Sequence, residues 1–313
     1  MHEAIRILPR FFKAHGHGND YLVFEQGDGP LLTPLLIRRI CHPHRGPGAD
    51  GLVVVESAQA GSPATLRMFN PDGREFERSG NGLRIAGVYL SRVEKTDTGP
   101  FPVEVAGDEV WLDVSGPDAE GLWDVSADMG RVEFPSGPPF LALGLLEDGG
   151  TVSLALSTPE GGDARVRVMP VSVGNPHAVA IRKGWSRREV DHYGPLISAH
   201  PAFPRGTNVQ FAEFPVGGRI AIRIWERGVG ATSASGTSAC AAVAAAVKSG
   251  LVPGGRTIVR MEGGNMEVEL GGDWSVRLRG PVEEVCTGEL TTAFLRAHAN
   301  QQNDPDCQKE DVG

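Results

Sequence analysis

The sequence predicts an α+β fold of two pseudo-symmetric halves, each a curved mixed sheet around a central helix. Two segments support this prediction, because 79–86 and 235–247 both turn from a glycine- and serine-containing loop into an apolar run. A helix that is apolar on every face is buried on every face, so each run is expected to lie inside a sheet. Strand-like runs outnumber helical ones, and 42 glycines and 23 prolines indicate many turns.

The two halves are indicated by a constant spacing between similar positions. Single matches of small residues mean little, but several matches at one offset indicate an internal repeat. The offset is 156 residues in three pairs: Ser79 and Ser235, Gly18 and Gly174, Asn70 and Glu226. We therefore expect each half to bring one helix N-terminus to a shared site.

In the first half, two helices and several short strands are expected. Thr33 and Pro34 are a preferred N-cap and first helical residue, so they predict a short helix over 33–40. Asn70-Pro71-Asp72-Gly73 is a strong turn signal, and the central helix follows at about 81–93. Strands are expected at apolar or alternating runs: 11–13, 21–24, 52–55, 65–70, 103–105 and 110–114.

The second half is expected to begin within 131–170 and to hold its central helix at 239–247. A weak helical pattern covers 187–197, and a closing helix is expected over 289–298. Gly280-Pro281 is expected to break the last strand. Strands are expected over 165–172, from 206 onward, and over 219–225, 257–261, 266–270 and 275–278.

These elements predict three parts of the chain. Residues 1–130 form the N-terminal half, with the segment 283–298 packing back on it. Residues 131–282 form the C-terminal half. Residues 299–313 are polar and are expected to be a disordered tail.

Composition excludes several classes of protein. A net charge of −9 without a basic cluster argues against a nucleic-acid partner. The four cysteines have no CxxC pair, which argues for a reducing compartment and against a zinc site. No apolar run reaches membrane-spanning length, and the first residues lack a signal-peptide core, so a cytoplasmic protein is expected.

The two helix starts suggest an anion-binding site. Free backbone N–H groups and the positive end of each helix dipole favour a carboxylate there. Amide side chains and Glu226-Arg227 lie in the neighbouring loops, so the site suits a zwitterion. Two facing helix ends would also stabilise the charge that forms when a carbon next to a carboxylate loses its proton. Such chemistry needs a base on one face of that carbon and an acid on the other.

Seven motifs, in order over most of 11–290, resemble the diaminopimelate epimerase family of cofactor-independent amino-acid epimerases. They are His15-Gly16-His17-Gly18-Asn19-Asp20, Asn70-Pro71-Asp72-Gly73, Gly80-Asn81-Gly82-Leu83-Arg84, Gly174-Asn175-Pro176-His177, Gly206-Thr207-Asn208-Val209, Glu226-Arg227-Gly228-Val229-Gly230 and Gly236-Thr237-Ser238-Ala239-Cys240. Gly280-Pro281-Val282 fits as well.

The resemblance implies conversion of LL-diaminopimelate to meso-diaminopimelate by two-base proton transfer in a cleft between two similar halves. The resemblance also implies a homodimer. No metal, pyridoxal phosphate or nucleotide is expected, because the sequence has no ligand cluster or phosphate loop. The family's substrate contacts carry over to Asn19, Asn70, Gly80, Asn81, Asn175, Asn208, Glu226, Arg227, Gly236 and Thr237.

The sequence departs from the family at the acid and base. The two family cysteines correspond to Ser79 and Ser235, and a serine hydroxyl needs a neighbouring base to act as one. Related proline-racemase-like isomerases tolerate serine on one side. Gly51 and Ala231 are lesser departures, at positions where some members carry glutamine and glutamate. Cys240 lies five residues inside its helix and is expected to be a buried structural residue.

Each candidate residue also has a purely structural interpretation. Ser79 and Ser235 fit helix N-caps, and asparagines in glycine-rich loops are common turn formers. Adjacent Glu226 and Arg227 fit a solvated pair. Turn or packing roles fit the remaining candidates, the histidines His15, His17 and His177.

Three functional hypotheses follow. The first is an amino-acid epimerase with Ser79 and Ser235 in the acid and base positions. The second keeps the fold but isomerises another substrate with a different base, such as a histidine or Glu226. The third is a non-catalytic amino-acid binder, or a chain in which both cysteines were deliberately replaced.

Overall fold

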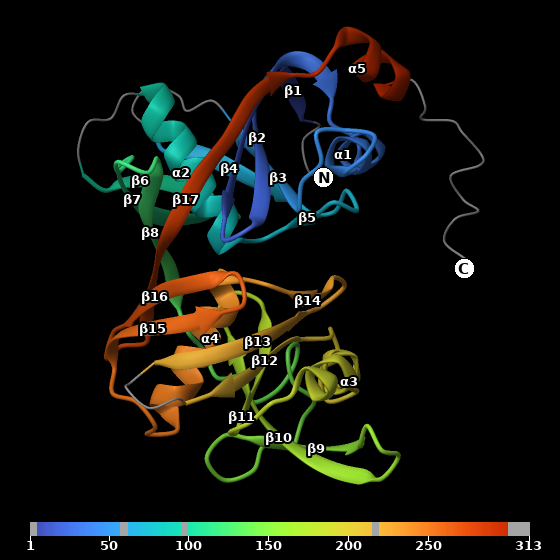
Figure 1. Ribbon diagram of the computed structural model, residues 1–313, viewed down its shortest axis with the longest axis vertical. Coiled ribbons are helices and arrows are strands. Elements are labelled where there is room, and N and C mark those ends of the chain that lie inside the picture. The colour runs from blue at the N-terminus through green and yellow to red at the C-terminus, as the bar shows by residue number, and fades with distance from the viewer. Residues whose placement is uncertain (1–4, 57–61, 95–98, 215–218, 300–313) are drawn as a thin grey trace.

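The protein folds into two lobes joined by a long strand (Figure 1). The computed structural model describes residues 5–56, 62–94, 99–214 and 219–299. Within them, mixed sheets surround buried helices in both lobes, which confirms the predicted α+β class with two similar halves. The predicted disordered tail lies outside the described residues, except for residue 299 at the end of a helix.

The elements of the two lobes follow one another in the same order. In the first lobe they are β1 (Arg6–Gly16), β2 (Asn19–Leu31), α1 (Pro34–Cys41), β3 (Gly51–Glu56), β4 (Ala64–Phe69), β5 (Glu75–Phe76), α2 (Gly80–Glu94), β6 (Phe101–Val105), β7 (Asp108–Ser115) and β8 (Leu122–Arg131). After a β-hairpin partner, β9 (Val152–Ser157), the second lobe has β10 (Asp163–Ser172), β11 (Pro176–Ile181), α3 (Arg187–Ser198), β12 (Asn208–Glu213), β13 (Ile220–Glu226), β14 (Gly230–Thr232), α4 (Gly236–Lys248), β15 (Gly255–Met261), β16 (Gly264–Leu270) and β17 (Ser275–Glu289).

Strand pairing repeats between the lobes. In the first, β1 pairs antiparallel with β2, β2 parallel with β3, β3 antiparallel with β4, and β4 parallel with β6. The second lobe has the same sequence of pairings from β10 to β15. Each lobe then continues through two antiparallel pairs. This repeated strand pairing gives a structural basis for the constant offset of 156 residues in the sequence.

The two central helices are α2 and α4. Residues 80–88 of α2 and 236–246 of α4 are buried, as their apolar sequences predicted. Cys240 is fully buried in α4, in agreement with a structural role. α4 is apolar on nearly every face, and its alanines let the surrounding sheet approach closely, whereas the buried stretch of α2 also contains Asn81 and Arg84.

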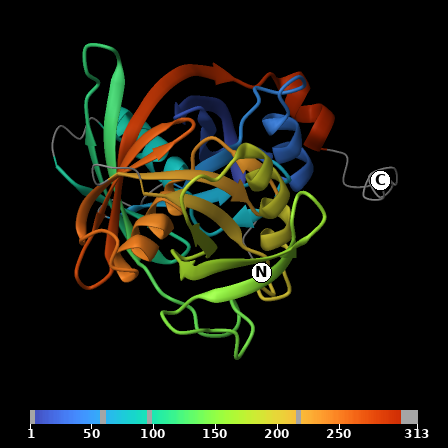
Figure 2. The ribbon, with the colours of Figure 1, turned by 60° about the horizontal axis from the view of Figure 1, so that its bottom comes forward.

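The predicted break at Gly280-Pro281 is wrong, because β17 continues from Ser275 to Glu289. Figure 2 shows this strand arching across the molecule toward the final helix, α5 (Thr292–Ala299). Along β17, pairing with β16 ends at Arg279 and pairing with β1 begins at Glu283. Between these points the strand pairs with β8 on one side only, where a proline costs no ladder bond.

The outer helices close the lobes. Thr33 caps α1, since its side chain accepts a hydrogen bond of 3.2 Å from the Leu36 N–H, as predicted. α5 begins at Thr292 rather than 289, because Glu289 still pairs with Arg10 in the sheet. Leu290 and Leu295 join the apolar core around α1.

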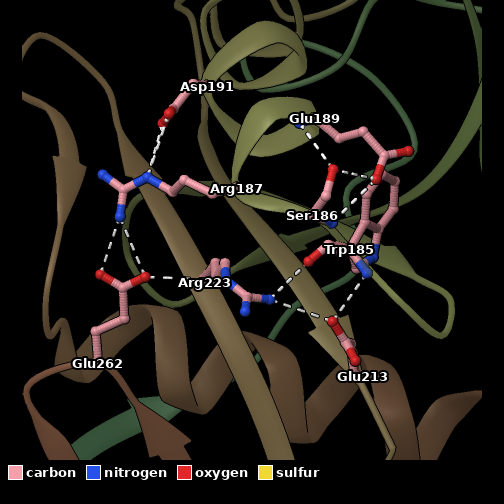
Figure 3. Close-up of polar contacts among 8 residues, drawn as sticks. All are labelled: Trp185, Ser186, Arg187, Glu189, Asp191, Glu213, Arg223 and Glu262. Carbon is pink, nitrogen blue, oxygen red and sulfur yellow. Dashed lines mark hydrogen bonds and ion pairs between the residues drawn. The ribbon is translucent and has the colours of Figure 1, made fainter.

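A polar network fixes the start of α3 (Figure 3). Ser186 and Glu189 form a capping box, in which each side chain accepts from the other's backbone N–H. Arg187 pairs with Glu262 at 3.1 Å, and Arg223 of β13 pairs with Glu213 of β12 at 3.3 Å. These contacts hold α3 on the sheet at a partly exposed position, and none of them involves α2 or α4.

Candidate active site

The N-termini of α2 and α4 meet in a cleft of about 450 Å³. Their first residues face each other, since a methyl group added at Gly236 would lie 3.4 Å from the Gly80 Cα atom. The two serines and the ten substrate contacts expected from the family resemblance all line this cleft. They are Ser79, Ser235, Asn19, Asn70, Gly80, Asn81, Asn175, Asn208, Glu226, Arg227, Gly236 and Thr237.

Tight packing of α4 against Leu278 of β17 requires glycine at Gly236. A methyl group there would lie 2.4 Å from the Cδ2 atom of the fully buried Leu278. We expect Gly236→Ala to lower the free energy of unfolding by about 1–3 kcal/mol, because overpacking shifts the helix or the core. Urea denaturation measures this. Gly272→Ala is the control, since its added methyl group meets nothing within 4 Å. Equal stability of the two variants would contradict the tight packing.

Ser79 lies just before α2 and has two polar neighbours. Its Oγ atom accepts a hydrogen bond of 3.1 Å from the Gly82 N–H, so the N-cap interpretation describes one of its contacts. Its side chain also lies beside the Tyr21 hydroxyl. Tyr21 is buried, and desolvation raises the pKa of its hydroxyl, whereas the interaction with Ser79 lowers it. Ser79 therefore has a neutral proton-bearing partner at its side.

Ser235 lies before α4 and differs from Ser79. The residue is buried, with 7% of its surface exposed, and its side chain makes no capping hydrogen bond to the helix. It lies instead beside the carboxylate of Glu226, at the end of β13. Burial raises the pKa of Glu226, and the negative charge of Asp50 adds to this, whereas the interaction with Ser235 lowers it. A carboxylate with a raised pKa is a stronger base than an ordinary one.

Glu226 and Arg227 make separate contacts rather than a mutual pair. Arg227 is exposed, and its guanidinium donates a hydrogen bond of 2.8 Å to the Arg205 carbonyl. Its backbone N–H donates to Asn208 Oδ1 at 2.9 Å, and Asn208 Nδ2 donates to the Pro176 carbonyl at 3.2 Å. Asn208 thus fixes the loop that holds both charged residues at the cleft.

The histidines do not line the cleft. His17 binds the Asn265 carbonyl, and His177 contacts Asn175 Oδ1 at 2.8 Å and Gln210 at 2.9 Å. His177 is buried, and desolvation lowers its pKa to about 3, so it is neutral at physiological pH. Its position suits orientation of Asn175, which does line the cleft. The packing interpretation of the histidines fits these contacts better than a catalytic one.

The described part of the chain shows neither a candidate metal site nor a candidate membrane-spanning helix. No group of three or more His, Cys, Asp and Glu side chains there is arranged to hold a metal ion. None of the described helices is both long enough and apolar enough to cross a membrane.

Comparison with known proteins identifies the family. The sequence model of the family described as diaminopimelate epimerase matches residues 11–135 and 169–285 of this chain. A protein named diaminopimelate epimerase 2 from Nostoc sp. is 36% identical over 288 residues, which cover 91% of this chain and 97% of that protein. The chain belongs to the diaminopimelate epimerase family. A diaminopimelate epimerase from Pelotomaculum thermopropionicum is 37% identical over 289 residues, covering 89% of this chain and 98% of that protein.

Membership in the diaminopimelate epimerase family places the chain among the isomerases, and solved structures agree in fold. A predicted epimerase from Pseudomonas aeruginosa has a TM-score of 0.64 at 19% identity, over 91% of this chain and 99% of that one. A hydroxyproline epimerase from Agrobacterium vitis has a TM-score of 0.65 at 17% identity, over 92% and 93%. At these identities the likeness concerns the fold alone.

Among the cleft residues that the sequence does not single out are Tyr21, Asp50 and Arg78. Tyr21 follows the first matching motif, and Asp50 precedes Gly51, so proximity to recognised positions was the available signal. Arg78 adjoins Ser79 and pairs with Asp108 at 2.9 Å. Their contacts join strands and loops far apart in the chain, which residue spacing does not reveal.

Proposed function

We propose that this protein inverts the α-carbon of an amino acid without a cofactor, and that the amino acid is LL-diaminopimelate, converted to the meso form. The observation that carries the proposal is the placement of Ser79 and Ser235 before two helix N-termini that face each other in one cleft. Each serine has an ionisable neighbour, and the two neighbours differ in kind. The names of the relatives support the choice of substrate.

Binding would use the two helix ends for the α-carboxylate. Their free N–H groups and dipoles favour an anion, and they stabilise the negative charge that spreads onto that carboxylate when the α-proton leaves. The exposed Arg227 suits the second carboxylate of diaminopimelate. Cleft amides, among them Asn70 and Asn175, complete a polar wall.

Proton removal would use Ser235 and Glu226 as a relay. The Ser235 Oγ atom accepts the α-proton while its own hydroxyl proton moves to the Glu226 carboxylate. Serine alone is too weak a base for this step, and the adjacent carboxylate supplies what it lacks. The carbanion keeps the electron pair of the broken C–H bond.

Proton delivery would use Ser79 on the opposite face of the carbon. Its hydroxyl proton moves to the carbanion, and the neighbouring Tyr21 hydroxyl gives its own proton to Ser79. The net result is inversion, with one proton taken up by Glu226 and one lost by Tyr21. Exchange with solvent restores both groups before the next turnover, and the reverse reaction exchanges their roles.

A chiral product assay tests the choice of substrate. The protein is incubated with LL-diaminopimelate and with a panel of other amino acids, and the stereoisomers are separated by chromatography. We expect meso-diaminopimelate to form with the highest kcat/KM of the panel. If another amino acid is inverted faster, that amino acid is the substrate instead of LL-diaminopimelate. If the protein binds amino acids but inverts none of them, it is a non-catalytic binder. The homodimer implied by the family resemblance stays a prediction, which light scattering checks.

A further inference from the structure

A fully buried arginine lies directly behind the cleft. Arg84, on α2, is 0% exposed, and none of the described carboxylates forms an ion pair with it. Its guanidinium donates to Asn81 Oδ1 and contacts the Met266 sulfur at 3.5 Å, while its Nε atom has no partner. A buried cation without a carboxylate is costly, so a role beyond packing is expected for Arg84.

The contacts of Arg84 continue into the cleft as a chain of amides. Asn81 Nδ2 donates to Asn19 Oδ1 at 2.7 Å, and Asn19 Nδ2 donates to Asp50 Oδ2 at 3.0 Å. Asp50 Oδ2 also accepts the Asp20 backbone N–H at 3.1 Å. A guanidinium can only donate, so it fixes which end of the Asn81 amide is the acceptor, and this in turn fixes Asn19.

Two glycines from recognised motifs make room for this arginine. A methyl group at Gly16 would lie 2.6 Å from Arg84 Nη2 and 2.9 Å from Asn81 Oδ1. One at Gly280 would lie 3.3 Å from Arg84 Cζ. The glycines come from β1 and β17, so three distant segments converge on one guanidinium. This explains two motif positions that the proposed reaction does not use.

We propose that Arg84 is a positioning residue that orients the Asn81 and Asn19 amides so that each keeps one N–H for a carboxylate in the cleft. The inference rests on the proposed function, because it names how that site selects an anionic group. Without Arg84, the Asn81 amide is free to turn over and present its oxygen to the carboxylate. The loss of a donor, and its replacement by an acceptor, would then weaken binding and misplace the α-carbon.

Three variants test the role. We expect Arg84→Met to lower kcat/KM for LL-diaminopimelate roughly 10- to 100-fold, the scale of small misplacements in an active site. Arg84→Lys keeps a donor and should recover most of that loss. Arg92→Met removes an arginine from the exposed end of the same helix and should leave kcat/KM unchanged. Wild-type kcat/KM in Arg84→Met, or an equal loss in Arg84→Lys, would overturn the proposal.

Side-chain amide NMR separates this inference from the proposed reaction. The protein is labelled with ¹⁵N-asparagine, and the side-chain amide signals of Asn81 and Asn19 are assigned by their loss in alanine variants. These signals should shift in Arg84→Met and should not shift in Arg84→Lys. Unchanged signals in Arg84→Met would overturn the inference even if the wild type inverts diaminopimelate. An inactive wild type with the expected shifts would instead contradict only the reaction. Should Arg84→Met not fold, Gly280→Ala is used instead, because its added methyl group would lie 3.3 Å from Arg84 Cζ with no Asn81 atom among its nearest neighbours, and it should give the same shifts.

Discussion

Replacing both cleft serines by cysteine is expected to raise the rate of diaminopimelate inversion roughly 10²- to 10⁴-fold, the usual contribution of general acid–base catalysis. A thiol with a reference pKa near ~8.5 holds a useful thiolate fraction at a helix N-terminus, whereas a serine hydroxyl does not. Ser79→Cys plus Ser235→Cys changes only one atom at each position. The rate of meso-diaminopimelate formation from the LL isomer measures the gain.

The control for this double variant is Ser249→Cys, which adds a thiol at the opposite end of α4. It should leave the rate unchanged. Substrate affinity, measured by calorimetry, should be similar in all three proteins. A double variant that binds diaminopimelate but gains no activity would show that the cleft geometry, and not the serine chemistry, limits the reaction.

Glu226→Gln is expected to lower kcat of the wild-type chain roughly 10²- to 10⁴-fold, because it removes the group that accepts the Ser235 proton. The carboxylate must be ionised to accept, so kcat should fall as pH drops through the pKa of Glu226. Burial raises that pKa above its ordinary value of 4.5, which places this acid limb above pH 4.5. The limb should be absent in Glu226→Gln. Steady-state kinetics across the pH range measure both effects.

Two comparisons separate catalysis from binding at Glu226. Glu262→Gln, at an exposed ion pair, should leave kcat unchanged. In the Ser235→Cys background, Glu226→Gln should cost less, since a thiolate needs no carboxylate to form; a double-mutant cycle measures this coupling. A Glu226→Gln variant with wild-type kcat and only a raised KM would assign Glu226 to substrate binding.

The fold was predictable to the extent that local pattern determines it. The apolar runs after Ser79 and Ser235 located both central helices, and Thr33-Pro34 located the start of α1. Gly280-Pro281 was misread because local sequence favours a break. The strand continues there because it crosses between the lobes with one edge unpaired, so the proline interrupts no hydrogen bond. This depends on the tertiary structure and not on the local sequence. The boundaries proposed for the two halves stay a prediction.

The sequence predicts many of the residues that line the site, but it does not predict which of them contact one another. The matching motifs located residues that the structure brings to one cleft. Spacing did not show that Glu226 reaches Ser235 or that Tyr21 reaches Ser79, because each of these contacts joins different elements and depends on how the sheet curves around the helix. Arg84 and Asn81 lie three residues apart on α2, so helical spacing places them on one face, but it does not show that they are buried behind the cleft.

Deuterium incorporation tests the central claim, two-base proton transfer by the two serines, most directly. LL-diaminopimelate is incubated in D2O with the wild type, Ser79→Ala and Ser235→Ala, and the α-proton and the stereoisomers are followed by NMR and chromatography. We predict that the wild type forms meso-diaminopimelate carrying deuterium at the inverted carbon, and that either alanine variant forms none. Inversion that persists at the wild-type rate in both variants, or wild-type binding without any loss of the α-proton, would contradict the claim.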